Sequence, residues 1–452
     1  MKDARGEGHS GGAGLFARAM RGSAITAGST AAAQGLRLAS NLVLARLLFP
    51  EAFGMMALVT VVIVGLQMFS DTGIGPAIAR SPRGDDRAFL DTAWTVQVCR
   101  GLLLWAVAAL ISVPFAALYR APELQALLPV AALALVIAGF NPTRIETAHR
   151  HLMLGRVTML DLASQAMGIV VMVALAWATG SVWALVAGSV IGAAVKLALT
   201  SALLPGPRNR FAWDRGAVRE LLGFGKWILL STICGFAMSQ GDRLILGAYL
   251  TLEELGIYNI GYFLASFPWL LGGAVTMRVM IPLYRDDPAG AKAANADRLR
   301  RMRWGMTGVL LGLLAAMAVL GVPLVGVLYD DRYAAAGAIV VMVACVQMPA
   351  VIGMTYDQAA LAAGDSRGFF WLLLAKALVQ TGAFLAGAEV GGLVGALAGQ
   401  GVALVLVHPL IIRLARRHGV WDGRHDLVAG GAAMLAIALA LWLNSGAIAA
   451  LL

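Results

Sequence analysis

The chain has 452 residues, of which 60% are hydrophobic and 13% are charged, and this charged share is about half of what a soluble domain carries. The composition excludes a water-soluble globule, a disordered or fibrous chain and a disulfide scaffold, and it indicates a polytopic all-α membrane protein. A net charge of +10 would indicate a nucleic-acid or acidic partner on a soluble chain, so the position of the cations decides its meaning.

Apolar stretches long enough to cross a bilayer need roughly 17–25 residues of helix. Thirteen are found, at 24–48, 53–79, 92–118, 123–143, 157–179, 181–204, 224–249, 255–284, 303–328, 335–363, 368–388, 391–412 and 427–452. The sequence Asn444-Ser445-Gly446 can split the last stretch, which would leave a short fourteenth helix.

Lysine and arginine are distributed unequally between alternate loops. If the N-terminus and every second loop are inside, 26 of the 35 cations lie inside, seven lie within spans, and only Arg120 and Arg332 lie in outside loops. The positive-inside rule therefore predicts a cytoplasmic N-terminus. Topology accounts for most of the positive charge, so no nucleic-acid partner is expected.

An internal repeat relates the two halves of the chain. The stretch Leu42–Gly54 aligns with Leu244–Gly256 at an offset of 202 residues, with five of thirteen pairs identical. The offset covers six spans, so the halves share one orientation and form two parallel lobes, an architecture that suits alternating access. The predicted parts are an N-terminal tail at 1–23, a first lobe at 24–204, a basic linker at 205–223, a second lobe at 224–415, and a basic loop with the C-terminal span or spans at 416–452.

Charges within spans are the best candidates for function, because a charge at mid-helix costs about 2.5–3.5 kcal/mol unless it faces a wet cavity or a partner. Arg37 lies near the middle of the first span, and Arg243 lies in the aligned seventh span. Each has polar neighbours at helical spacing. The alternative is an interhelical salt bridge that only holds the lobes. The candidate cavity residues are Gln34, Arg37, Asn41, Ser239, Gln240 and Arg243.

Other charged residues are candidates for recruiting an anionic headgroup and for ion coupling. Arg144 and Arg278, at the inside mouth, are candidates for recruiting an anionic headgroup, because guanidinium binds phosphate bidentately. Asp71, Asp242 and Asp357 are candidates for ion coupling or gating, although Asp71 also suits a helix cap beside a kink. The sequence contains no phosphate-binding loop and no His/Cys metal cluster, so we expect neither a cofactor, a metal nor an enzymatic activity.

Three stretches of the chain resemble a known protein family. The stretch Asn41–Arg80 resembles the N-terminal signature of bacterial polysaccharide flippases of the Wzx type, with L-A-R-x-L-x-P-x-x-F-G at Leu44–Gly54 followed by D-x-G at Asp71–Gly73. Thr92–Leu124 and Gly241–Tyr262 also resemble that family. The superfamily to which it belongs also holds the MATE drug exporters and the lipid II flippase.

The resemblance implies a MATE-like protein of the bacterial inner membrane. Such a protein translocates undecaprenyl-pyrophosphate-linked oligosaccharide to the periplasmic leaflet for capsule, exopolysaccharide or O-antigen synthesis, and it is coupled to a gradient of protons or sodium ions. The expected partners are the lipid-linked oligosaccharide, membrane lipid and other polysaccharide-assembly proteins, with a monomeric transport unit.

Two alternatives stay open at this level. A cation-coupled multidrug exporter of the same fold would need acidic residues deep in the first lobe, for which Asp71 is thin support. A non-transporting assembly scaffold or a membrane glycosyl enzyme belongs to another class, and the near-absence of soluble loops argues against both.

Overall fold

The computed structural model describes residues 28, 31–70, 73–151, 153–223, 225–276, 284 and 293–451. Two predicted site residues, Asp71 and Arg278, lie outside these ranges. The chain divides into two compact units, of which the first comprises Met1–Leu48 and Val62–Leu230 and the second comprises Phe49–Val61 and Ser231–Leu452.

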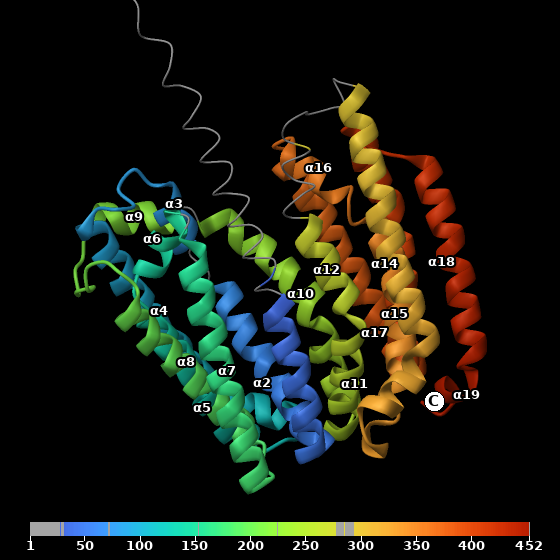
Figure 1. Ribbon diagram of the computed structural model, residues 1–452, viewed down its shortest axis with the longest axis horizontal. Helices are drawn as coiled ribbons and strands as arrows, with labels where there is room; N and C mark the ends of the chain where they lie inside the picture. Colours follow the sequence, from blue (N-terminus) through green and yellow to red (C-terminus); the bar gives the residue numbers. More distant parts are fainter. Residues whose placement is uncertain are drawn as a thin grey trace, which may run out of the picture. The chain divides into compact units, whose positions relative to one another are not determined.

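The first part of the chain is helical throughout, with short connections (Figure 1). A helix at 31–47 is followed by α2 (Pro50–Phe69), α3 (Ile74–Arg80), α4 (Arg87–Leu118), α5 (Leu124–Gly139), α6 (Arg144–Arg150), α7 (Leu154–Thr179), α8 (Trp183–Leu203) and α9 (Arg215–Gly223). Packing within the first unit is dominated by the neighbouring pairs α4–α5 and α7–α8, with α5 also against α8. Such antiparallel neighbours are what short connections between long helices produce.

The second part of the chain is also helical. It comprises α10 (Gly225–Tyr249), α11 (Leu252–Ala265), α12 (Phe267–Val275), α14 (Ala293–Leu328), a short 3₁₀ turn (Asp331–Tyr333), α15 (Ala336–Gly353), α16 (Asp357–Ala362), α17 (Ser366–Arg417), α18 (Gly423–Leu443) and α19 (Ser445–Ala449). The central element of the second unit is α15, which is apolar on all sides and packs against α11, α14, α17 and α18. A helix without a polar face is expected in such a buried position.

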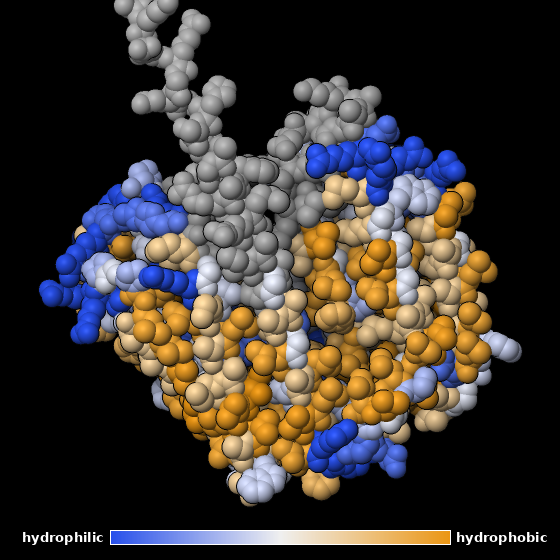
Figure 2. All heavy atoms as spheres, in the orientation of Figure 1, coloured by the Kyte–Doolittle hydropathy of each residue, from blue (hydrophilic) through white to orange (hydrophobic). Residues whose placement is uncertain are grey.

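The helices carry the apolar surface of a membrane protein. Within the described residues, eight helices are long and apolar enough to cross a bilayer, or nine if α5 and α6, bent by 59°, count as one span. Figure 2 shows hydrophobic side chains along the helices and hydrophilic ones gathered toward their ends. The prediction of an all-α polytopic membrane fold is confirmed.

The number of long helices is smaller than the thirteen predicted stretches for local reasons. Two predicted spans merge in α17, whose 52 residues are broken by non-helical backbone at Gly391 and Gly392. Gly392 has a φ of +55°, which glycine adopts without the steric penalty of a side chain. In α10, Asp242 and Arg243 interrupt the apolar sequence.

The last predicted stretch is split at Asn444, as its sequence allowed. Asn444 is the C-cap of α18, and α19 begins at Ser445. The Asn444 side chain donates hydrogen bonds to the carbonyl oxygens of Ala440 at 2.9 Å and Ala318 at 3.3 Å. The amide therefore ends α18 and ties that end to α14.

The predicted repeat is supported by a reciprocal backbone contact. A Cβ atom at Gly54 would lie 2.0 Å from the Leu252 carbonyl oxygen, and one at Gly256 would lie 1.8 Å from that of Pro50. Leu252 and Gly256 follow Pro50 and Gly54 by the offset of 202 residues. The two copies thus contact each other as the halves of a two-fold interface do. Residues 49–61 group with the second unit because they pack against α11 in this way.

Candidate functional site

Arg243 and Asp242 form the centre of a polar cluster between α10 and α11. Nη1 of Arg243 donates to the two carboxylate oxygens of Asp242 at 3.1 and 3.2 Å, and Nε donates to Oδ1 of Asn259 at 3.1 Å. The hydroxyl of Tyr258 donates to Asp242 at 2.7 Å. The guanidinium carbon lies 4.4 Å from the ring centroid of Tyr262, a cation–π distance.

This cluster satisfies its own charges. The side chains of Arg243 and Asp242 are only 12% and 8% exposed, and Nη1 of Arg243 also donates to the Ser239 carbonyl at 3.3 Å. An anionic ligand at Arg243 would have to compete with a carboxylate already in place. This ion pair joins neighbouring residues of α10 and is not the interhelical salt bridge of the alternative interpretation. The cavity role of Arg243 stays a prediction.

The remaining predicted residues of α10 lie beside this cluster. The Ser239 side chain is exposed and donates to the Phe236 carbonyl at 3.4 Å. Oε1 of Gln240 is buried and has no hydrogen-bond partner among the described residues. The partners on α11 were not predicted, although Tyr258, Asn259 and Tyr262 form a polar i, i+1, i+4 set in an otherwise apolar helix.

The predicted polar face of the first span lies on the helix at 31–47. Arg37 is exposed, and Gln34 and Asn41 are half-buried. Helix α7 flanks this helix, because Nε2 of Gln165 donates to the Ala33 carbonyl at 3.0 Å. Arg37 and Arg243 belong to different units, so a cavity shared between them stays a prediction.

Arg144, predicted at the inside mouth, begins α6 and is 9% exposed. Its Nη1 donates to the Leu204 carbonyl at 2.6 Å. A Cβ atom at Gly206 would lie 3.1 Å from the Arg144 side chain. The arginine thus links α6 to the segment that follows α8, which is a structural role. Recruitment of a headgroup by Arg144 stays a prediction.

Asp357, a predicted coupling residue, begins α16 and forms an ion pair with Lys376 of α17. The two side chains are 17% and 13% exposed. Oδ1 of Asp357 has no hydrogen-bond partner among the described residues. The pair holds α16 to α17, and a coupling role of Asp357 stays a prediction.

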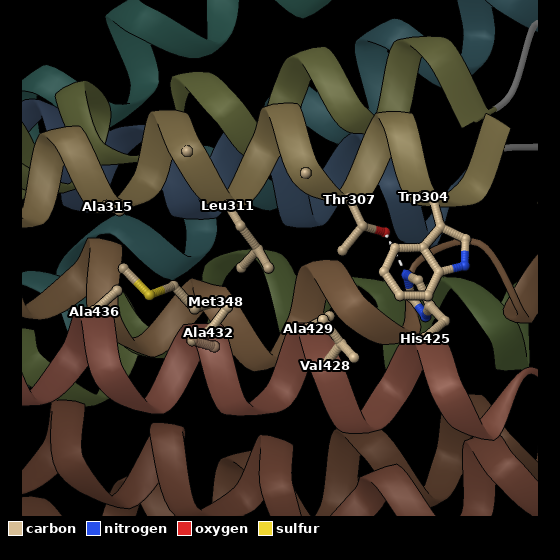
Figure 3. Close-up of a pocket in the computed structure, with 13 residues that line it drawn as sticks. Trp304, Thr307, Leu311, Ala315, Met348, His425, Val428, Ala429, Ala432 and Ala436 are labelled. Atoms are coloured by element: carbon tan, nitrogen blue, oxygen red, sulfur yellow. Dashed lines mark hydrogen bonds between the residues drawn. The ribbon is translucent and has the colours of Figure 1, made fainter. Parts of the chain in front are cut away.

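A groove in the second unit leads to a further polar site (Figure 3). A cavity of about 310 Å³ lies between α14 and α18, with mostly apolar walls. Trp304, Thr307 and His425 form its polar end, where Oγ1 of Thr307 is 3.0 Å from Nε2 of His425.

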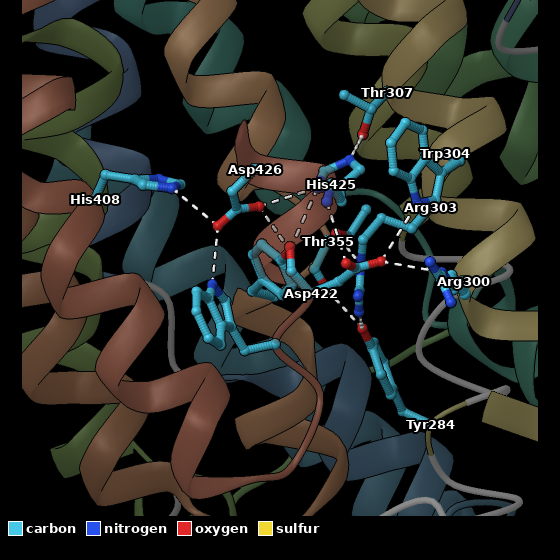
Figure 4. A network of polar contacts seen from close by, with 12 residues as sticks. Tyr284, Arg300, Arg303, Trp304, Thr307, Thr355, His408, Asp422, His425 and Asp426 are labelled. Atoms are coloured by element: carbon cyan, nitrogen blue, oxygen red, sulfur yellow. Dashed lines mark hydrogen bonds and ion pairs between the residues drawn. The ribbon is translucent and has the colours of Figure 1, made fainter. Parts of the chain in front are cut away.

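Beyond His425 lies a carboxylate held by two imidazoles (Figure 4). Oδ1 of Asp426 is 3.0 Å from Nδ1 of His425, and Oδ2 is 3.2 Å from Nε2 of His408 on α17. The Tyr356 hydroxyl and the Trp421 indole donate to the same carboxylate at 2.7 and 3.0 Å. Asp426 on α18 thus links that helix to α17 through His408.

The network continues around Asp422, the N-cap of α18. Its carboxylate accepts from the Trp304 indole at 3.3 Å and lies 3.4 Å from Nε of Arg300. Beside it, buried Arg303 donates to Thr355 at 3.2 Å and to the hydroxyl of Tyr284 at 3.0 Å. Within the described residues, no group of His, Cys, Asp and Glu side chains is arranged to hold a metal ion.

The fold is that of a multi-pass all-α membrane protein, with a buried charged cluster in its second unit. The chain belongs to the family described as "Polysaccharide biosynthesis protein", which matches residues 43–338. The resemblance to the Wzx-type flippases seen in the sequence is therefore confirmed.

Individual relatives agree with this family. The chain is 25% identical to "Succinoglycan biosynthesis transport protein ExoT" of Rhizobium meliloti, over 80% of this chain and 73% of that protein. It is 23% identical to "Lipopolysaccharide biosynthesis protein WzxC" of Escherichia coli, over 64% of this chain and 58% of that protein. The solved structure "Lipid II flippase MurJ, inward closed conformation" matches with a TM-score of 0.66 and 10% identity, over 93% of this chain and 98% of that one. The MurJ fold is the one that the superfamily resemblance predicted.

Proposed function

We propose that this protein is a flippase that moves a lipid-linked oligosaccharide from the cytoplasmic to the periplasmic leaflet of the bacterial inner membrane, for assembly of a surface polysaccharide. The observation that carries the proposal is the reciprocal contact between the repeats, in which Gly54 meets Leu252 and Gly256 meets Pro50. A pair of parallel repeats supports a transporter that works by alternating access. Membership of the polysaccharide biosynthesis family supports a lipid-linked glycan as the class of substrate.

The lipid substrate is anionic. Undecaprenyl pyrophosphate carries its charge next to the membrane surface, and arginine is the side chain best suited to bind phosphate oxygens. Arg37, with its exposed side chain in the first unit, is our candidate for this contact. A membrane potential that is negative inside favours outward movement, by about 5 kcal/mol per 100 mV for two negative charges.

The coupling ion is a proton in this proposal. Asp242 and Asp357 each have a cation as partner, Arg243 and Lys376. Asp426 instead contacts His408 and His425, which are charged only when they are protonated. The group formed by His408, Asp426 and His425 is therefore our candidate for the coupling site.

A strain that lacks the gene tests the proposal. Loss of the protein should accumulate lipid-linked oligosaccharide in the cytoplasmic leaflet and abolish the surface polysaccharide, and the wild-type gene should restore both. Leaflet position is measured by enzymatic access to the glycan in spheroplasts and in inverted vesicles. Drug sensitivity with an unchanged glycan distribution would instead identify an exporter. Loss of polysaccharide without leaflet accumulation would identify an assembly scaffold.

A further inference from the structure

Two cavities of the second unit adjoin at Trp304. The first, of about 550 Å³, is lined by charged side chains, and the second is the apolar groove of about 310 Å³ between α14 and α18. Trp304 lines both, so the charged cavity and the apolar groove adjoin at this side chain. The lining of the charged cavity is Asp297, Arg300, Arg301, Trp304 and Arg424.

The charged cavity lies at one end of two helices that are long and apolar enough to cross a bilayer. Its residues occupy the first turns of two spanning helices, Asp297–Leu328 and Gly423–Leu443. These ends belong to the basic side of the chain, which the charge distribution assigns to the cytoplasm. Trp304 follows one turn deeper along α14, and tryptophan is enriched at this boundary between headgroups and hydrocarbon.

The charged cavity is cationic. It contains three guanidinium groups and one carboxylate, that of Asp297. Arg300 is partly neutralised by Asp422, 3.4 Å away (Figure 4), whereas Arg301 and Arg424 have exposed side chains that line the cavity. The cavity therefore favours a negatively charged group that several arginines can contact together.

The groove below it is suited to a hydrocarbon chain. Small residues on both helices leave it unfilled, among them Gly308 and Gly312 on α14 and Ala432 and Ala436 on α18 (Figure 3). A Cβ atom at either glycine would meet no other atom within 4 Å. The polar atoms at the end beside Trp304, on Thr307 and His425, already bond to each other, so the remaining wall is apolar.

We propose that the charged cavity and the adjoining apolar groove together bind one anionic phospholipid of the cytoplasmic leaflet. The phosphate group lies against Arg301 and Arg424, and one acyl chain runs along the groove between α14 and α18. A basic pocket between spanning helices on the cytoplasmic side is a recognised form of anionic-lipid site. A soluble anion would leave the apolar groove empty, and a zwitterionic lipid would leave the net positive charge uncompensated. The lipid joins α18 to α14, and this inference does not depend on the proposed flippase activity.

Native mass spectrometry of the purified full-length protein tests the site, with phosphatidylglycerol and phosphatidylcholine as the added lipids. The wild type should retain one phosphatidylglycerol in preference to phosphatidylcholine. Each arginine contributes about a fivefold factor in affinity, so the double variant R301Q/R424Q should lose about 25-fold. Arg298→Gln is the matched control, because Arg298 is an exposed arginine on the same helix that does not line the cavity.

The groove is tested separately by filling it. Gly308→Leu places a side chain in the open space where the acyl chain is expected, and leucine also favours a helix over glycine. The variant should keep or raise its melting temperature in detergent without lipid, and it should lose the additional rise that phosphatidylglycerol gives the wild type. Gly326→Leu, at another open position of α14, should retain that rise.

Several results would overturn the assignment. Equal retention of the two lipids by the wild type would exclude a site for anionic phospholipid. An equal loss in R298Q and R301Q/R424Q would mean that diffuse surface charge attracts the lipid. Retention of phosphatidylglycerol by Gly308→Leu would exclude the groove. Co-purification of a polyprenyl phosphate that phosphatidylglycerol cannot displace would identify a different occupant.

Discussion

At the residue scale, the clearest question is whether Arg243 serves stability or transport. Its removal leaves Asp242 buried without its cation, although Tyr258 still donates to that carboxylate. Breaking a buried ion pair in this way costs about 3–5 kcal/mol, whereas replacing both partners costs much less. The two kinds of variant therefore separate the two roles.

We expect Arg243→Ala to lower the melting temperature and the amount of protein in the membrane, and the double variant Asp242→Asn/Arg243→Gln to restore most of both. Thermal unfolding in detergent measures the stability, and surface polysaccharide per molecule of protein measures the function. A structural arginine predicts near-normal polysaccharide in the double variant. Complete loss of polysaccharide at normal stability would show that Arg243 contacts the substrate.

The second prediction at this scale concerns Asp426. Its carboxylate interacts with His408, His425, Tyr356 and Trp421. An asparagine keeps the size but has only one acceptor oxygen, so we expect Asp426→Asn to lower transport at least about tenfold, because His408 and His425 lose the carboxylate that they share. The measurement is polysaccharide export at several external pH values. Export that keeps its wild-type rate and pH dependence would exclude Asp426 from coupling.

Asp365→Asn is the control for Asp426→Asn, because it alters another Asp–His pair. Asp365 accepts from the Gly368 amide and lies 3.1 Å from Nε2 of His418. The amide hydrogen bond, with a further contribution from His418, lowers the pKa of this carboxyl group below its ordinary value. Asp365 is an N-cap outside the spanning helix, so its loss should cost about 0.5–2 kcal/mol of stability and leave the pH dependence of export unchanged.

The sequence singles out the charged residues within spans, but it does not show which side chains contact them. Asp242 and Arg243 stand out because charges are rare in an apolar helix. Asn259 and Tyr262 lie in the next helix, and only the turn between α10 and α11 brings them to Arg243. His408 and Asp426 lie on two helices, so no local spacing links them. Contacts that depend on helix pairing cannot be read from periodicity within one helix.

At the scale of elements, the contact of α2 with α11 depends on two glycines. Any side chain at Gly54 or Gly256 would place its Cβ within 2.0 Å of a backbone carbonyl oxygen. Backbone cannot move aside as the end of a flexible side chain can, so the helices would have to separate. The repeat in the sequence predicted that Gly54 and Gly256 are equivalent positions. It did not predict that the two segments are in contact, because similarity between repeats carries no information about distance.

We expect Gly54→Ala and Gly256→Ala each to destabilise the protein by about 1–3 kcal/mol, the usual cost of overpacking, and the leucine variants to cost more. Gly241→Ala on α10 is the matched control, since its Cβ would meet nothing within 4 Å. Melting temperature and polysaccharide export are the measurements. Wild-type values for both Gly54→Ala and Gly256→Ala would contradict the close contact.

At the scale of the whole molecule, composition predicted the membrane fold because it is a sum over many residues, in which local errors cancel. The break in α17 follows from the thickness of the membrane. A continuous helix of 52 residues would be about 80 Å long, whereas the hydrocarbon core is about 30 Å thick. The chain must therefore turn within α17, and Gly391 and Gly392 are where it does so.

The alternation of basic loops predicts which side each turn faces, and we expect Gly391→Cys to be accessible from the periplasm. A membrane-impermeant maleimide should label it in intact spheroplasts at a rate similar to Ser181→Cys, in the turn between α7 and α8. Ser366→Cys, at the opposite end of α17, should react only after permeabilisation, because 25 residues separate it from Gly391, about 38 Å of helix. The three native cysteines, Cys99, Cys234 and Cys345, are replaced by alanine in the parent protein. Labelling of Gly391→Cys and Ser366→Cys from the same side would mean that the first half of α17 does not cross the membrane, and the parallel six-span lobes would then be wrong.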